Sequence, residues 1–350
     1  MQQTRVVIVS PALADANNGN WRTARRWQRL LAPHHAVRIV RQWPDAAASE
    51  RDRVLLALHA RRSAASAAAW AAARGAGGSA PDNTAGLAIV LTGTDLYRDI
   101  HSDPAARQSL TLAQRLVVLQ ERGPDALPAA LRLKARVIFQ STAARQPLVK
   151  SQKYLRAVMV GHLRDEKSPQ TLFAVARLLK DDGTLFIDHI GDALDPALGQ
   201  EARATAAACP NYRWLGGLAH EATRRRIQRA HVLVHSSRIE GGAHVIMEAV
   251  RSGTPVLASR IAGNLGMLGD DYAGYFELGD AQALAGLLRR CRDSQVSQKH
   301  PAGTESWLAG LNAQCAQRAR LFTPDAERAA LLQLITELLV PAPAQPAMQR

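Results

Sequence analysis

The sequence has 350 residues, a length that predicts about two domains of ordinary size. Hydrophobic residues make up 47% of the chain and charged residues 21%, so it can bury a sizeable core. No apolar run approaches the roughly 18 residues that a membrane-spanning helix needs, so we expect no stable membrane insertion.

The start of the chain and its cysteines indicate the compartment. MQQTRVVIVS passes directly into an apolar strand and lacks the layout of a signal peptide. Cys209, Cys291 and Cys315 lie far apart with no CxxC spacing, which supports neither a disulfide framework nor a zinc site. We therefore expect a reduced, cytoplasmic protein.

The formal net charge of +14 is the unusual feature of the composition. A basic excess suits nucleic acid, an anionic membrane surface or small anionic substrates. The basic residues are scattered, however, and the densest cluster, Arg224–Arg226, falls in a helical pattern near Glu221. The sequence also lacks the interleaved aromatic and basic residues of RNA-recognition segments. We therefore expect no nucleic-acid partner and interpret most of the excess as solvated surface.

Short β-branched runs alternate with longer helical patterns along the whole chain. In the first part of the chain the predicted strands are Arg5–Ser10, Ala36–Val40, Arg53–Leu58, Leu87–Thr92 and Val137–Phe139. The predicted helices between them are Trp21–Leu31, Ser63–Ala73 and Gln108–Gln120. A second series has strands at Arg156–Val160, Thr184–Ile190, His231–Ser236 and Thr254–Ala258, with helices at Pro169–Lys180 and Ala243–Ser252.

The two series predict an α/β protein with two Rossmann-like, doubly wound domains. Several strands are continuous apolar runs, which is typical of parallel sheets covered on both faces. We place the N-terminal domain at residues 1–152 and the C-terminal domain, with its last helices, at residues 153–340. The Pro/Ala-rich residues 341–350 are predicted to be a disordered tail. No pattern indicates an oligomeric state.

The most informative segments follow strands, where open α/β sheets bind their ligands. In the N-terminal series these segments are Asn17–Asn20, His59–Arg62 and Thr92–Asp95. In the C-terminal series they are Gly161–Lys167, Gly191–Asp192 and Arg238–Ala243.

Two glutamates eight positions apart stand out in the segment SRIEGGAHVIMEAV. Glu240 precedes Gly241 and Gly242, which would let the backbone approach a ligand, and free N–H groups at a helix start favour anionic oxygens. Glu248 would lie in the second turn of the helix with its carboxylate directed back toward this turn, where it could accept hydrogen bonds from a ribose diol. The alternative is that Glu240 is an acid near the helix cap and Glu248 a surface residue.

The stretch from Glu240 to Ser259 resembles the E-x7-E signature of family 4 glycosyltransferases, which are GT-B enzymes that use nucleotide-sugar donors. Val160–Lys167 (VGHLRDEK) is similar to the glycine loop of that family, in which an arginine and a lysine five positions apart hold the donor diphosphate. Lys167 matches the lysine, whereas His162 stands at the arginine position, and Arg164 is a candidate for the missing charge. Asn211–Glu240 also matches the family layout.

The resemblance implies two domains facing a central cleft, with the donor bound by the C-terminal one. Lys167, Arg164 and Glu240 become the candidate catalytic residues, because a leaving diphosphate needs positive charge. We expect no metal and no cofactor, since the sequence has no DxD-like pair beside these cations. His244 could contact the donor or could be a packing or capping residue. The implied donor-binding residues are Gly161, His162, Gly191, Gly241, Gly242, Ala243, His244 and Glu248.

The N-terminal domain would then take the acceptor. LTGTDL resembles a strand-end motif of the family, with Thr92 where many relatives have histidine. Together, NNGNWRTARRW, ALHARRSA, LTGTDLYRDI and SRIEGGAHVIMEAV resemble most closely the selenosugar synthases of selenoneine biosynthesis, which implies that selenophosphate is joined to the sugar of UDP-N-acetylglucosamine. The candidate acceptor-binding residues are Gly19, Asn20, Arg22, His59, Arg61, Arg62, Thr92, Gly93, Thr94 and Asp95.

Other interpretations remain open at this point. The arginines after the strands could be ordinary solvent-facing residues at helix starts. The chain could be another family 4 enzyme with a lipid or carbohydrate acceptor, for which Trp21–Leu31 would be an amphipathic helix at a membrane. A non-catalytic nucleic-acid-binding protein would rest on the net charge alone.

Overall fold

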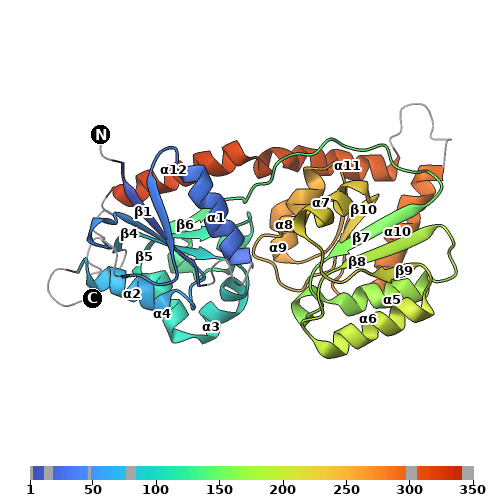
Figure 1. The fold of residues 1–350 in the computed structure, drawn as a ribbon, viewed down its shortest axis with the longest axis horizontal. Coiled ribbons are helices and arrows are strands. Elements are labelled where there is room, and N and C mark those ends of the chain that lie inside the picture. The colour runs from blue at the N-terminus through green and yellow to red at the C-terminus, as the bar shows by residue number, and fades with distance from the viewer. Residues whose placement is uncertain (1–2, 12–18, 46–48, 76–83, 297–305, 341–350) are drawn as a thin grey trace. The chain divides into compact units, whose positions relative to one another are not determined.

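The computed structural model describes residues 3–11, 19–45, 49–75, 84–296 and 306–340. The chain divides into two compact units (Figure 1). The N-terminal unit comprises Met1–Gln140 together with Pro324–Arg350, and the C-terminal unit comprises Ser141–Thr323. Each unit is built on one sheet of parallel strands, so the predicted α/β fold class with two Rossmann-like units is confirmed.

The sheet of the N-terminal unit has the strand order β2-β1-β3-β4-β5-β6. Its strands are β1 (Arg5–Val9), β2 (Ala36–Val40), β3 (Val54–Leu58), β4 (Thr84–Leu91), β5 (Ala113–Val118) and β6 (Ala135–Val137). Its helices are α1 (Gly19–Leu31), α2 (Ala64–Ala72), α3 (Ile100–Ser102), α4 (Pro104–Leu112) and α12 (Pro324–Leu339).

Alternate residues of the central strands supply two apolar layers, because successive side chains of a strand point to opposite faces. Val7 and Val9 of β1 pack with Trp70 of α2 and with residues of α4. Val6 and Ile8 pack with Trp27 of α1 and with the apolar face of α12. Both faces of the sheet are therefore covered, as the continuous apolar strands predict.

Helix α12 returns from the end of the C-terminal unit to the N-terminal unit. The buried Glu327 accepts hydrogen bonds from Trp27 Nε1 at 2.6 Å and Arg26 Nε at 2.8 Å. Near the other end of the helix, Glu337 accepts hydrogen bonds from Arg115 Nε at 2.6 Å and Arg136 Nε at 2.9 Å. The last helices are predicted to belong to the C-terminal domain, and this prediction is corrected for α12, because all of these partners belong to the N-terminal unit. They lie some 200 to 300 positions earlier in the sequence, so no local pattern reveals the contact.

The boundary between the units also differs from the predicted one. The division falls after Gln140 rather than at residue 152. The intervening residues bind the C-terminal unit: Arg145 N donates to Arg251 O at 2.9 Å, and Lys150 Nζ donates to Thr254 Oγ1 at 3.2 Å. These contacts attach residues 141–151 to the C-terminal unit. The segment has no helix or strand, so no periodic pattern in the sequence predicts where it packs. The predicted tail, residues 341–350, lies outside the described residues.

The sheet of the C-terminal unit has the order β12-β11-β10-β7-β8-β9. Its strands are β7 (Leu155–Val160), β8 (Leu185–Ile190), β9 (Tyr212–Trp214), β10 (Val232–His235), β11 (Val256–Ser259) and β12 (Tyr275–Phe276). Its helices are α5 (Pro169–Leu178), α6 (Pro196–Ala208), α7 (His220–Arg229), α8 (His244–Val250), α9 (Ala262–Leu268), α10 (Ala281–Val296) and α11 (Trp307–Arg318). The strand order runs outward in both directions from the neighbours β7 and β10. Open α/β sheets bind ligands at such a switch point, beyond the carboxyl ends of the strands.

Three short strands and one helix boundary differ from the sequence predictions. The predicted helix Gln108–Gln120 is instead α4 followed by β5, because Leu116, Val117 and Val118 are all buried in the middle of the sheet. Strand β6 ends at Val137, where the predicted strand begins. Strands β9 and β12 have three and two residues and are too short to show an alternating pattern. In the part of the chain that the structure describes, no helix is both long enough and apolar enough to cross a membrane.

Candidate functional site

The switch point of the C-terminal unit brings together Lys167 and Glu240, which lie 73 positions apart in sequence. Gly161 follows β7, and a short turn over Asp165–Lys167 carries the lysine back across it. A Cβ atom at Gly161 would lie 3.3 Å from Cγ of Lys167, so the glycine makes room for the lysine stem. The ammonium group of Lys167 contacts Oε1 of Glu240, in the turn that follows β10.

The surroundings of Glu240 keep its carboxylate charged. Burial alone would raise the pKa of Glu240, but the Lys167 ammonium and the His235 imidazole hold that pKa well below its usual range. Nε2 of His235, the last residue of β10, lies 3.2 Å from Oε1 of Glu240. The result is a largely enclosed cation and carboxylate at the end of two neighbouring strands, as the sequence predicts for Lys167 and Glu240.

The turn that carries Glu240 is fixed by contacts from the next strand and helix. Ser259 Oγ donates to Ser237 O at 2.6 Å, and Asn264 Nδ2 donates to Ser259 O at 2.9 Å. A Cβ atom on Gly263 would come within 2.1 Å of the carbonyl oxygen of Glu240, so the first turn of α9 packs directly against this backbone. Such a rigid support is what a preorganised binding site needs.

Glu248 is a buried residue of α8, with only 4% of its surface exposed. Its Oε1 lies 2.6 Å from Nε2 of His220, the first residue of α7. The interpretation of Glu248 as a surface residue is therefore wrong. Sequence reasoning missed His220, because nothing in the pattern of α7 indicates that its first side chain meets a residue 28 positions later.

The glycines and the remaining donor-side residues occupy the same end of the sheet. A Cβ atom on Gly191 would lie 2.0 Å from the carbonyl oxygen of Gly161, so the loops after β7 and β8 touch. Gly241, Gly242 and Ala243 form the turn before α8, which begins at His244. Helix α8 has only seven residues, so we base the candidate site on its side chains and not on an anion-binding effect of the helix dipole.

His162 and Arg164 do not join the contact between Lys167 and Glu240. Nδ1 of His162 accepts a hydrogen bond from the backbone N–H of Asp192 at 3.1 Å and lies 3.7 Å from Asp192 Oδ2. Arg164 is half-exposed, and its Nε lies 3.8 Å from Glu166 Oε2. Its position at the mouth of the loop leaves Lys167 as the enclosed cation of the glycine loop.

In the N-terminal unit, the predicted acceptor residues cluster at the ends of β3 and β4. Asp95 is fully buried and accepts hydrogen bonds from the backbone N–H groups of Ala60, Thr92 and Gly93, each at 2.9 Å. Asp95 therefore ties the two strand-end loops together instead of facing a ligand. Thr94 precedes the wide helical turn Asp95–Asp99, a π-type turn of the kind often found at functional sites.

His59 is also a structural residue of this cluster. It is buried and has a left-handed φ of 74°. Burial lowers the pKa of His59, and its Nδ1 accepts the backbone N–H of Arg62 at 3.4 Å. Its Nε2 lies 3.8 Å from Asp99 Oδ2 and its side chain is 4% exposed, so His59 is enclosed at these strand ends, and its role at an acceptor site stays a prediction.

Arg61 and Arg62 do provide cations at this end of the sheet. Nε of Arg61 lies 3.2 Å from Oδ2 of the buried Asp99. Sequence reasoning assigned no role to Asp99, although it lies in the segment LTGTDLYRDI. Arg62 is exposed, and no carboxylate pairs with it among the described residues.

The last predicted acceptor residues lie at the start of α1. Gly19 and Asn20 open the helix, Thr23 Oγ1 donates to Gly19 O at 2.9 Å, and Arg22 is exposed. Open space surrounds the Cβ position of Gly19, so packing does not require glycine there. Asn17 and Asn18 lie outside the described residues.

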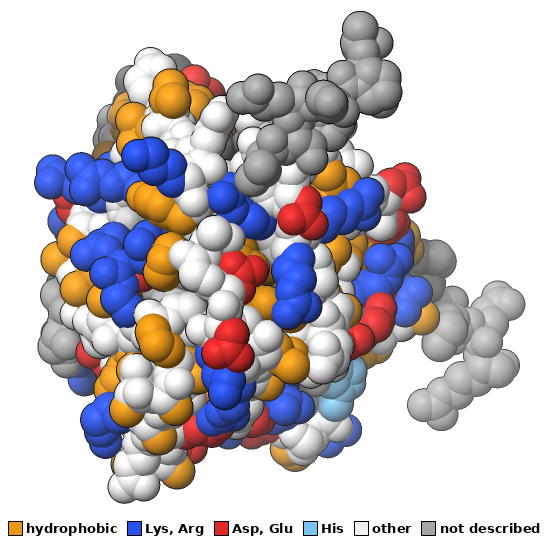
Figure 2. Space-filling view, turned by 90° about the vertical axis from the view of Figure 1, so that its right-hand side faces the viewer, with side chains coloured by type: hydrophobic (Ala, Val, Ile, Leu, Met, Phe, Trp, Pro, Cys, Tyr) orange, Lys and Arg blue, Asp and Glu red, His pale blue; other side chains and the backbone are white. Residues whose placement is uncertain are grey.

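Helix α1 buries its apolar face in the protein, so that face is not available to bind a membrane surface. Trp27 and Leu31 pack in the core of the N-terminal unit, and Trp27 Nε1 donates to Glu327. The amphipathic pattern of Trp21–Leu31 is therefore explained by packing. Over the face shown in Figure 2, Lys and Arg side chains are spread among Asp and Glu and do not form a continuous stripe.

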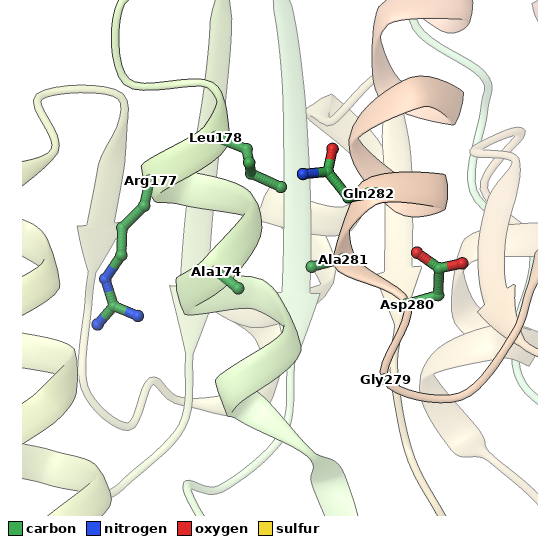
Figure 3. Close-up of a pocket in the computed structure, with 7 residues that line it drawn as sticks. All are labelled: Ala174, Arg177, Leu178, Gly279, Asp280, Ala281 and Gln282. Atoms are coloured by element: carbon green, nitrogen blue, oxygen red, sulfur yellow. The ribbon is translucent and has the colours of Figure 1, made fainter.

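A cavity of about 570 Å³ lies away from all of these residues, between α5 and α10. Leu178 and Gln282 point toward one another across it, while the Arg177 guanidinium points away (Figure 3). That guanidinium lies 3.1 Å from Glu201, and Asp280 Oδ1 accepts the backbone N–H of Ala283 at 2.8 Å. Because its charged groups are already engaged, this cavity is a weaker candidate than the ends of β7 and β10.

Comparison with known proteins gives a family match for part of the chain and a fold for the whole of it. Residues 140–302 match the family model described as glycosyl transferases group 1. The fold is similar to sucrose-phosphate synthase from Thermosynechococcus elongatus, with a TM-score of 0.70, 16% identity and coverage of 96% of this chain and 99% of that one. It is also similar to HepE from Anabaena in complex with UDP, with a TM-score of 0.68, 15% identity and coverage of 96% and 100%.

A third similar structure is TarM from S. aureus, in complex with fondaparinux, α-GlcNAc-glycerol and UDP. The TM-score is 0.59 at 12% identity, and the chain covers 55% of the length of TarM with 80% of its own. These likenesses show the GT-B fold. The family match over residues 140–302 supports a glycosyltransferase of group 1.

Proposed function

We propose that this chain transfers the sugar of UDP-N-acetylglucosamine to selenophosphate, giving a 1-seleno-sugar, UDP and phosphate. The observation that carries the donor half of this proposal is the enclosed contact between Lys167 and Glu240 at the switch point of the C-terminal sheet. The HepE structures in complex with UDP and with UDP-glucose make a uridine nucleotide the first donor to test.

The reaction is a displacement at the anomeric carbon. Selenium attacks C1 of the sugar, the bond from C1 to the diphosphate oxygen breaks, and the electron pair leaves with UDP. A water molecule then cleaves the phosphorus–selenium bond of the product, releasing phosphate and the seleno-sugar. The Lys167 ammonium offsets the charge that develops on the departing diphosphate, and in our proposal this lysine does so without a metal ion.

The acceptor half of the proposal rests on the arginines at the strand ends of the N-terminal unit. A small anion offers few atoms for apolar contact, so charge and hydrogen bonding must supply most of its affinity. Arg62 is exposed and has no carboxylate partner among the described residues, whereas Asp99 already engages Arg61. Arg62 is therefore the primary candidate to bind the acceptor.

The test is incubation of the enzyme with UDP-sugars and either selenophosphate or phosphate, followed by mass spectrometry. We expect a seleno-sugar from UDP-N-acetylglucosamine and selenophosphate, formed equally well in excess chelator. No seleno-sugar with any UDP-sugar, together with transfer to a lipid or carbohydrate, would replace the proposed acceptor. Loss of activity in chelator and its return with magnesium or manganese would overturn the metal-independent chemistry.

A further inference from the structure

His220 makes a contact that the proposed donor site does not yet explain. Its Nε2 lies 2.6 Å from Oε1 of Glu248, a distance typical of a strong, charge-assisted hydrogen bond. Glu248 is almost fully buried, whereas the side chain of His220 is 52% exposed. An exposed imidazole is thus fixed on one oxygen of an enclosed carboxylate.

We infer that His220 is a positioning residue of the donor site, which holds the Glu248 carboxylate in the orientation that binds the ribose hydroxyls of the nucleotide. This inference rests on the proposed function, within which Glu248 accepts hydrogen bonds from the ribose of UDP, the role that the sequence suggests for it. His220 itself has no other role in that proposal. It lies within Asn211–Glu240, the segment that matches the family layout, but nothing in that segment singles it out.

The two oxygens of Glu248 differ in their contacts. His220 engages Oε1, while Oε2 receives no hydrogen bond from any residue in the described ranges. A carboxylate can accept on both oxygens, so the open Oε2 has capacity for a ligand hydroxyl. The imidazole bond fixes the terminal torsion of the glutamate, which is otherwise soft.

The Arg224 guanidinium interacts with the same carboxylate without replacing His220. Arg224, one turn further along α7, is buried and donates from Nη2 to Ala143 O at 2.6 Å. Burial lowers the pKa of Arg224, and the charge of Glu248 partly offsets that effect. Arg224 therefore balances the charge of Glu248, whereas its hydrogen bond holds the chain at residue 143 and leaves the orientation of the carboxylate to His220.

The experiment compares the affinity of UDP with that of 2′,3′-dideoxy-UDP by calorimetry. In the wild type we expect UDP to bind more tightly than the dideoxy analogue. In His220→Ala we expect UDP to bind about tenfold more weakly, as for the loss of one charge-assisted hydrogen bond, while the dideoxy analogue keeps its wild-type affinity. His220→Gln, which retains an N–H donor, should recover part of the lost affinity.

Two further variants separate positioning from general damage. His34→Ala, at another exposed histidine, should change neither affinity. In a Glu248→Gln background, the additional change His220→Ala should cost little, because the group it positions is gone.

The outcomes distinguish failure of the proposed donor site from failure of the role inferred for His220. Equal binding of UDP and the dideoxy analogue by the wild type would remove Glu248 from the ribose site and thus overturn the proposed donor geometry. A wild-type preference for UDP that His220→Ala leaves intact would overturn the inference alone. An equal loss for both nucleotides in His220→Ala would also overturn it, since the effect would then not pass through the ribose.

Discussion

At the scale of single residues, the donor site depends on buried charge that is matched by an opposite charge. Glu240 and Lys167 are both largely enclosed, and burying either charge without a partner would destabilise the fold. Their contact offsets that desolvation cost. In our proposal, the diphosphate of the nucleotide replaces Glu240 as the partner of Lys167.

Replacing Lys167 by alanine should weaken UDP binding. The change removes a charge-assisted hydrogen bond to the diphosphate, which typically contributes about 1.5–3 kcal/mol, so we expect a loss of roughly tenfold to a hundredfold in affinity. Calorimetry with UDP measures it. Lys180→Ala, on an exposed position after α5, is the matched control and should bind UDP normally. Wild-type affinity in Lys167→Ala would place the diphosphate elsewhere.

Replacing Arg62 by alanine should raise the KM for selenophosphate and leave UDP binding unchanged. The reason is that Arg62 is an exposed cation of the N-terminal unit, whereas the proposed donor contacts belong to the other unit. Arg61→Ala should have a smaller effect, because Asp99 already engages that guanidinium. Steady-state kinetics with each substrate varied in turn gives both parameters. Arg225→Ala, a surface charge of α7 paired with Glu221, controls for diffuse electrostatics. An equal loss in all three variants would argue for a diffuse effect.

At the scale of elements, the sequence predicts the strands and helices that have a periodic apolar pattern. It does not predict features that depend on contacts between residues far apart in the sequence. The apolar strands β1, β3 and β7 and the helices α1 and α5 show their periods in the sequence. Strand β5 does not, because it begins at Ala113 directly after α4 ends at Leu112, with no turn signal between them. Helix α12 gives no sign in its sequence of packing on a sheet formed some 200 residues earlier. The same limit applies to the site. Lys167, Glu240 and Glu248 stand at motif positions with an expected role. His220 and Asp99 also lie in quoted segments, but only their contacts in the structure single them out.

Helix α12 offers a direct test of the observed unit boundary. Glu327→Gln removes the carboxylate that accepts hydrogen bonds from both Arg26 and Trp27 in the core. Breaking a buried charged pair costs about 3 kcal/mol or more, so the N-terminal unit should unfold at clearly lower urea. Asp325→Ala, in the exposed first turn of the same helix, should change the urea midpoint little. Similar midpoints for Glu327→Gln and the wild type would mean that α12 does not hold the N-terminal unit together.

Strand β8 makes stability depend on pH through His189. Burial lowers the pKa of His189 from 6.5 to about 4, and its Nδ1 lies 2.9 Å from the Tyr212 hydroxyl. Below about pH 6.5 the unfolded chain takes up a proton that the folded chain does not, so the free energy of unfolding falls until about pH 4, by up to about 3 kcal/mol. Urea unfolding at pH 7, 5.5 and 4.5 measures this slope. In His189→Gln the slope should be shallower than in the wild type, and identical slopes would contradict the assignment.

At the scale of the whole molecule, two sheets of the same class carry different chemistry at their strand ends. The C-terminal sheet has its switch point between β7 and β10, and the loops after these strands hold Lys167 and Glu240, with Glu248 following in α8. The N-terminal sheet presents arginines after β3, supported by a fully buried aspartate. In our proposal, the C-terminal unit binds the nucleotide, and the N-terminal unit binds the small anion with part of the basic excess that gives the net charge of +14.

A crystal structure of the chain with UDP tests the central claim most directly. We expect the nucleotide at the carboxyl ends of β7 and β10, with the Lys167 ammonium moved from Glu240 to the diphosphate and Oε2 of Glu248 accepting from the ribose. His220 should remain on Oε1 of Glu248. UDP bound in the cavity between α5 and α10, or bound with Lys167 still on Glu240 and Glu248 out of reach of the ribose, would contradict the account.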